Sequence, residues 1–111
     1  KYDSLVMIFG CNDDKDVPAM LREVGLGADK VLFTKSRGNV RAAEPSSLET
    51  RFEEVSGKMA QVCPTLEDAL KVAHRAVGRD DLIVICGSFY LAGEARKYFL
   101  DAKKRNEKKK A

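Results

Sequence analysis

Polar and charged residues follow the apolar segments of the chain at four places, and these residues are the ones whose types could do chemistry. The four groups are Cys11–Asp16, Lys35–Ala42, Pro64–Thr65 and Gly87–Tyr90. If the apolar segments are parallel strands, the groups lie at the carboxyl ends of a sheet, where open α/β folds collect ligands. Most of the unusual polar side chains belong to the first, second and fourth groups, so we expect a site there.

The first group, Asn12-Asp13-Asp14-Lys15-Asp16, places carboxylates and an amine just before a predicted helix. One interpretation is helix capping with solvated charge. The other is a charged site at the mouth of the sheet. A phosphorylated receiver domain also has an acidic pair here, but it needs an aspartate after its third strand. This chain has Pro64-Thr65 there, which argues against that class.

The fourth group begins where the strongest apolar segment meets a predicted helix, at Gly87-Ser88. Free backbone N–H groups and the positive end of the helix dipole favour a carboxylate or phosphate there, and the Ser88 hydroxyl adds a donor. The alternative is that Ser88 only caps the helix. Because the sequence contains neither a G-x-G-x-x-G nor a P-loop motif, we expect no phosphate cradle within the chain.

The elements that must position these groups alternate along the chain. Apolar segments predict strands at 5–9, 30–34, 59–63 and 82–86. Helical periods predict four helices: one capped by Asp16 and ending at Gly25 or Gly27, one opened by a capping box at 46–49, one capped by Thr65 and carrying Val77, and one bearing Ala92, Ala95 and Phe99. This order predicts an α/β fold, a Rossmann-like three-layer sandwich whose mostly parallel sheet is flanked by helices.

Length and charge limit the classes of protein. The 111 residues suffice for one domain, which we place at 1–102. Six of the 20 Lys and Arg residues lie in 103–111, so the net charge of +3 comes from a basic tail that we expect to be disordered. No aromatic residue interrupts that tail, which argues against nucleic-acid binding. No apolar run approaches the roughly 20 residues of a membrane helix.

The three cysteines and one histidine do not form a recognisable site. Cys11, Cys63 and Cys86 lack C-x-x-C spacing and lie far from His74 in the sequence, so neither a disulfide framework nor a metal site is expected. Reduced thiols agree with a cytoplasmic protein. The chain opens at Lys1 without an initiator methionine, and we expect it to be cut from a longer protein.

Three segments resemble folylpolyglutamate synthases and dihydrofolate synthases, which are Mur-type ligases. Gly10 followed by Asp14-Lys15-Asp16 resembles their "G…DKD" signature. Thr34, 39–42 and 45–48 are similar to "T…NPRA…P..L", with Val40 in place of the usual proline. Residues 87–94 are similar to "GS.YL.GE". The segments occur in the right order and span most of the chain.

This resemblance implies the Rossmann-like C-terminal domain of an enzyme that adds L-glutamate to folate or dihydropteroate through an acyl phosphate. It implies that ATP and Mg²⁺ serve the full-length enzyme and are held by a preceding ATPase domain, against which this domain packs. No catalytic residue is expected in the chain. Ser88 is the first choice for contacting glutamate, with Tyr90 beside it. Asp14, Lys15 and Asp16 would face the interdomain cleft, with Lys15 as an electrostatic partner for a phosphate or carboxylate. Arg41 would do the same or hold the neighbouring loop in place.

Two alternatives remain open from the sequence. One is the C-terminal domain of another Mur-type ligase, which joins amino acids to a cell-wall precursor. The other is a non-catalytic nucleotide-binding or interaction module. The sequence preceding this chain in its gene would separate these interpretations, because a P-loop domain followed by "DGAHNP" supports the folate ligase.

Overall fold

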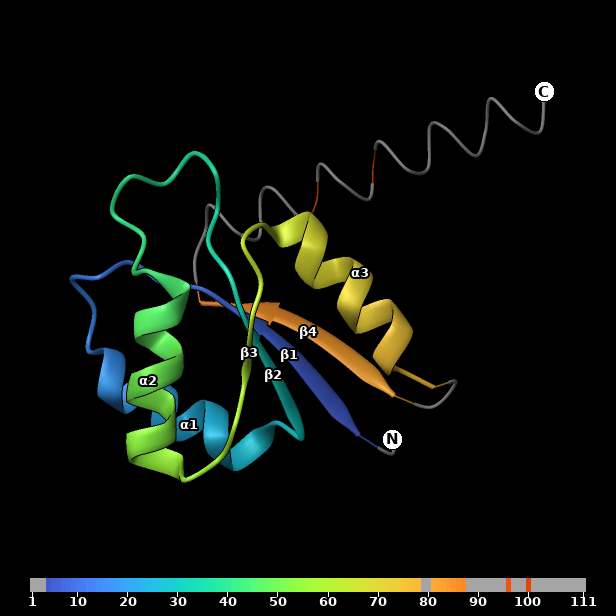
Figure 1. Ribbon diagram of the computed structural model, residues 1–111, viewed down its shortest axis with the longest axis horizontal. Coiled ribbons are helices and arrows are strands. Elements are labelled where there is room, and N and C mark those ends of the chain that lie inside the picture. Colours follow the sequence, from blue (N-terminus) through green and yellow to red (C-terminus); the bar gives the residue numbers. More distant parts are fainter. Residues whose placement is uncertain (1–3, 79–80, 88–95, 97–99, 101–111) are drawn as a thin grey trace.

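A single four-stranded parallel sheet forms the centre of the computed structural model, which describes residues 4–78, 81–87, 96 and 100. The strands are β1 (Leu5–Phe9), β2 (Lys30–Phe33), β3 (Gln61–Val62) and β4 (Leu82–Cys86). Their spatial order is β3-β2-β1-β4, so β1 pairs with a neighbour on each side (Figure 1). The first, second and fourth predicted strands are confirmed nearly to the residue.

Helices cover both faces of this sheet. They are α1 (Val17–Gly27), α2 (Pro45–Ser56) and α3 (Leu66–Ala76). Figure 1 shows α1 and α2 on one side of the sheet and α3 on the other. The predicted three-layer α/β architecture is therefore confirmed. It follows from the parallel pairing, since each strand must return to the same end of the sheet through a crossover helix.

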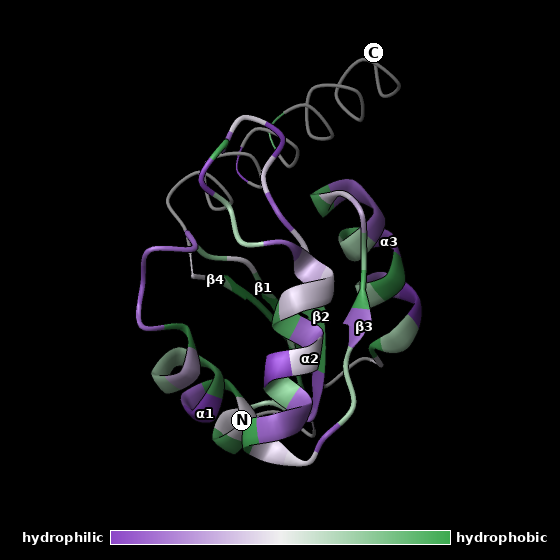
Figure 2. Ribbon diagram, turned by 60° about the vertical axis from the view of Figure 1, so that its left-hand side comes forward, coloured by the Kyte–Doolittle hydropathy of each residue, from purple (hydrophilic) through white to green (hydrophobic). Residues whose placement is uncertain are grey.

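The core consists of two apolar layers that share the strands. Phe9 and Phe33 face α1 and α2, whereas Ile8 and Leu32 face α3. Alternate residues of a strand point to opposite faces, so a strand covered on both faces must be apolar throughout. Figure 2 shows β1 and β4 as hydrophobic, in contrast to the hydrophilic segment between β1 and α1. Phe33 also meets Phe52 of α2 edge to face, with ring centroids 5.4 Å apart.

The helix starts are set by local capping, with one correction. Asp16 caps α1 by accepting from the Ala19 N–H, and Thr65 caps α3 by accepting from the Asp68 N–H. The predicted capping box at 46–49 is wrong, because α2 begins at Pro45 with Glu44 as its N-cap and no side-chain cap. Proline fixes φ near its helical value and needs no N–H partner in the first turn, so the helix starts two residues earlier than a cap at Ser46 would place it.

Several predictions fall on residues outside the described ranges. These are the last helix, the basic tail at 103–111 and the boundary of the domain at residue 102. They stay predictions. The third strand is confirmed but shorter than expected, because only Gln61 and Val62 pair with β2. None of the helices in the described ranges is long and apolar enough to cross a membrane.

The carboxyl ends of β1 and β4 approach each other closely at two glycines. The Gly10 N–H donates to the carbonyl oxygen of Cys86 at 3.3 Å. Gly87 has φ +101, and a Cβ there would overlap with the carbonyl oxygen of Gly10. A side chain at position 87 would therefore meet both backbone strain and a clash with backbone atoms that cannot rotate away.

We expect Gly87→Ala to destabilise the chain by about 2–4 kcal/mol, since a positive-φ cost of roughly 1–3 kcal/mol adds to the clash. Gly57→Ala is the matched control, because Gly57 also has a positive φ (70) but has open space around its Cβ position. Urea unfolding of the two variants measures the difference. Equal losses of stability would show that the approach of Gly87 to Gly10 carries no cost.

Candidate functional site

The strand order places a topological switch point at the carboxyl edge of the sheet, between β1 and β4. From β1 the chain continues to β2 and β3 on one side, and β4 lies on the other side. At such a switch point the two connections lead away from each other, which opens a crevice for ligands. The segment 10–16 follows β1, and Gly87-Ser88 follows β4. The sequence prediction placed its candidates at this edge.

Two loops that are distant in sequence are joined at this edge by main-chain hydrogen bonds. The Ala43 N–H donates to the Cys11 carbonyl at 2.8 Å, and the Asp13 N–H donates to the Arg41 carbonyl at 2.9 Å. Between them, Asn12 and Ala42 form an isolated antiparallel bridge. The loop after β2 is thereby fixed beside the loop after β1. Arg41 thereby lies beside Asp13 and Asp14.

Side chains add two further ties to the loop after β2. The Asn39 Nδ2 donates to the Asn12 Oδ1 at 2.6 Å, and the Asn39 Oδ1 accepts from the Arg41 N–H at 3.1 Å. At the base of the loop, Lys35 and Glu44 form an ion pair of 2.7 Å. Sequence reasoning missed these ties. The only available signal was that both loops contain an asparagine.

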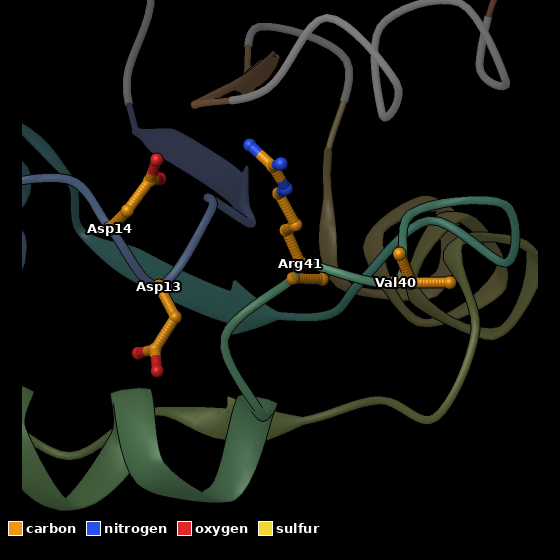
Figure 3. A pocket seen from close by; sticks show the side chains of 5 residues that line it. Asp13, Asp14, Val40 and Arg41 are labelled. Carbon is orange, nitrogen blue, oxygen red and sulfur yellow. The ribbon is translucent and has the colours of Figure 1, made fainter.

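A pocket of about 490 Å³ lies between the joined loops, lined by Asp13, Asp14, Val40, Arg41 and Ala42. Figure 3 shows Asp14 and Arg41 extending to the same side of the ribbon, whereas Asp13 turns toward α2. There Asp13 lies 3.6 Å from Arg51. Within the described ranges the Arg41 guanidinium and the Asp14 carboxylate have no ion-pair partner. The pocket therefore offers one cation and one anion to a ligand that carries both charges.

The predicted site residues are thus only partly brought together. Asp14 and Arg41 line the same pocket, and their predicted place at an interdomain cleft stays a prediction. Lys15 is exposed in the turn before α1 and does not line the pocket, and Asp16 serves as the N-cap of α1. The capping interpretation of Asp16 is therefore confirmed. Ser88 and Tyr90 lie outside the described residues, and their roles stay predictions.

The cysteines do not have the environment of reactive thiols. Cys11 and Cys63 are buried, and burial raises the pKa of each thiol, with a nearby aspartate as the next cause. Burial also raises the pKa of Cys86. Because the thiolate is the nucleophile, a raised pKa lowers reactivity near neutral pH. In the part of the chain that the structure describes, the cysteines act as small apolar residues.

The side chains at this edge do not supply a metal-binding set. Across the described ranges, no three His, Cys, Asp or Glu side chains gather to hold an ion. Asp13 is paired with Arg51 and Asp16 is used in capping. The described donors therefore do not fit a resident divalent cation.

The fold and this edge define a class: a doubly wound α/β domain that presents a charged pocket at the carboxyl edge of its sheet, between the loops after β1 and β2. Residues 1–89 match the family described as Mur ligase, glutamate ligase domain. The chain belongs to that family. The resemblance found in the sequence is thereby confirmed.

Relatives of the chain include folylpolyglutamate synthases. It is 28% identical over 96 residues to a probable bifunctional folylpolyglutamate synthase/dihydropteroate synthase of Haloferax volcanii, covering 86% of this chain and 11% of that protein. It is similar to a Mycobacterium tuberculosis folylpolyglutamate synthase solved with ADP and AMPPCP, at 30% identity, TM-score 0.78, and 89% and 24% coverage. Escherichia coli FolC with ADP shares the fold, at 20% identity, TM-score 0.77, and 95% and 24% coverage. The chain thus spans about a quarter or less of these relatives.

We expect Asp16→Ala to lower the free energy of unfolding by roughly 0.5–1 kcal/mol, because it removes the N-cap of α1. The cap bond to the Ala19 N–H is 3.4 Å long and exposed, which favours the lower end of that range. Asp14→Ala removes the same charge from a carboxylate with no hydrogen-bond partner in the described ranges, so its effect should stay within about 0.5 kcal/mol. Equal effects in urea unfolding would contradict the capping role.

Proposed function

We propose that this chain works as the C-terminal domain of an ATP-dependent ligase that adds glutamate to folate or dihydropteroate. It would bind the incoming amino acid and close over the cleft rather than do the chemistry. The observation that carries the proposal is the Arg41 guanidinium, which faces a pocket at the carboxyl edge of the sheet without an ion-pair partner among the described residues. Family membership supports this choice of substrate class.

The charges of the pocket suit a free amino acid. Glutamate carries two carboxylates and an ammonium group. A guanidinium binds a carboxylate through two parallel hydrogen bonds, and Arg41 would supply that contact. Asp14 would attract the ammonium group from the same pocket. Lys15 and Ser88, with Tyr90 beside it, are the further proposed contacts, and Asp16 would support them through the start of α1.

The activation of the second substrate belongs in this proposal to the rest of the ligase. ATP would phosphorylate the folate or pteroate carboxylate, and the glutamate amine would displace phosphate to form the amide. Similar structures contain ADP and AMPPCP in one case and AMPPNP with a Mn ion in another, which supports a nucleotide and a divalent metal in the parent enzyme. A complex of Escherichia coli FolC with DHPP and ADP is a further fold neighbour. We place the parent enzyme in the cytoplasm.

The alternative Mur-type ligase and the non-catalytic module are less favoured. The similar proteins at 28% and 30% identity are named as folylpolyglutamate synthases, which supports folate over a cell-wall precursor. The match to the glutamate ligase domain family favours a ligase domain over a non-catalytic module. Binding of a cell-wall amino acid instead of glutamate would favour the first alternative.

We expect Ser88→Ala in the ligase that contains this chain to raise the KM for glutamate about ten- to a hundredfold, because a hydrogen bond to a charged group contributes roughly 1.5–3 kcal/mol. The KM for ATP should change much less, since the nucleotide would be held chiefly by the other part of the enzyme. Steady-state kinetics with each substrate varied in turn measures both values.

A capping role for Ser88 gives a different result. It predicts about 1 kcal/mol of lost stability with an unchanged KM for glutamate. Measuring the melting temperature and the glutamate KM on the same variant decides between the two. A less stable variant with normal glutamate kinetics would reduce Ser88 to a helix cap.

We also expect the 111-residue chain alone to show no folate-dependent release of ADP from ATP. The reason is that its sequence contains no P-loop motif. Incubation with ATP, Mg²⁺, glutamate and a folate, followed by ADP assay, tests this, with the complete ligase as the positive control. Folate-dependent turnover by the chain would refute the division of labour proposed above.

A further inference from the structure

The backbone of Arg41 is held at both of its polar groups. Its N–H donates to the Asn39 Oδ1 at 3.1 Å, and its carbonyl accepts from the Asp13 N–H at 2.9 Å. The neighbouring Val40 side chain is 99% exposed, so apolar packing does not anchor the tip of the loop. The position of Arg41 therefore depends on polar ties, and the tie through Asn39 is a side-chain one.

The Asn39 amide has only one orientation that satisfies these ties. The Arg41 N–H is a donor, so the amide atom facing it must be the oxygen. The Nδ2 group then points to Asn12, whose Oδ1 accepts it at 2.6 Å in a partly buried position. Position 12 must accordingly provide an acceptor. A residue without one would leave the Nδ2 group unpaired and release the amide that holds Arg41.

The residue that supplies this acceptor sits on the loop that carries Asp14. Asn12 follows β1 by three residues and also forms the main-chain bridge to Ala42. The Asn12 side chain thus ties the loop of Arg41 to the loop of Asp14, and these two residues are the charged pocket residues without an ion-pair partner in the described ranges. The main-chain bonds hold the two loops beside each other. The pair of amide side chains holds the backbone N–H of Arg41.

We propose that Asn12 is a positioning residue, which through Asn39 holds Arg41 in place for a ligand carboxylate across the pocket from Asp14. This rests on the function proposed above for the pocket. Asn12 touches no substrate in this account. Its effect passes through the Asn39 amide to the backbone of Arg41, and from there to the placement of the guanidinium.

The test compares Asn12→Leu, which has a similar size but no acceptor, with Asn12→Asp, which keeps one. Asn12→Leu should raise the KM for L-glutamate of the ligase about ten- to a hundredfold, since misplacement of a binding group by an ångström has effects of that order. Its kcat should stay within about twofold, because the variant weakens glutamate binding and leaves the catalytic groups unchanged. Asn12→Asp should restore most of the affinity. Thr50→Ala, which removes an exposed 3.1 Å bond within α2, is the control.

A second readout uses the 111-residue chain without any ligand. Asn12→Leu should accelerate hydrogen exchange of the Arg41 N–H by about tenfold, because breaking a net hydrogen bond shifts local opening by that order. Asn12→Asp and Thr50→Ala should leave this rate unchanged. A normal Arg41 exchange rate in Asn12→Leu would overturn the proposal directly. The proposal would also be overturned if Asn12→Asp changed the exchange rate of the Arg41 N–H or the glutamate KM as much as Asn12→Leu does.

Arg41→Met separates the two proposals. If Arg41→Met raises the glutamate KM and Asn12→Leu does not, the positioning role of Asn12 is wrong and the function proposed for the pocket stands. If Arg41→Met leaves the glutamate KM unchanged, Arg41 does not bind the substrate and the positioning role falls with it. Ser88→Ala then still tests glutamate binding independently.

Discussion

The close approach of β1 and β4 at their carboxyl ends is the constraint on which the rest of the site depends. β1 pairs with β2 on one side and with β4 on the other. Where β1 and β4 end, the Gly10 N–H donates a hydrogen bond to the Cys86 carbonyl. Only a residue without a side chain fits at Gly87, where a Cβ would meet the backbone of Gly10. This contact fixes where both segments leave the sheet. The contact also fixes the start of the segment that carries Asp13 and Asp14 to the pocket.

The charged residues at this edge divide into those used by the fold and those left for a ligand. Asp13 is paired with Arg51, Asp16 caps α1 and Glu44 is paired with Lys35. Asp14 and Arg41 have no such partner in the described part of the chain, and both line the pocket. The backbone of Arg41 is held there at both its N–H and its carbonyl, which keeps its side chain at the pocket. In the proposed function, Asp14 and Arg41 bind the amino acid because the fold does not use their charges.

The fold could be predicted from the sequence because its signals are local. Apolar runs marked the strands, and Asp16 and Thr65 marked the starts of two helices. The start of α2 was mispredicted because Pro45 competes with a capping box one residue later. The site was predicted only in part. Parallel topology implied that the loops after β1 and β2 share an edge, but it did not give the register in which Asn12 meets Ala42, 30 residues on. Without that register, the amide pair and the separate roles of neighbouring aspartates stay hidden.

The exposure of the pocket explains why such a domain would depend on the rest of an enzyme. Asp14, Val40 and Arg41 are all exposed, and charges in contact with water attract a ligand weakly. Covering the pocket would exclude water and strengthen the same contacts several-fold, because the effective dielectric constant falls. The exposed Val40 at the rim offers apolar surface that such a cover would bury. In the proposed ligase, closure of the cleft would therefore strengthen glutamate binding and bury Val40 in one step. This closure would couple the binding of glutamate to that of the folate substrate, and the coupling would need no catalytic residue of this chain.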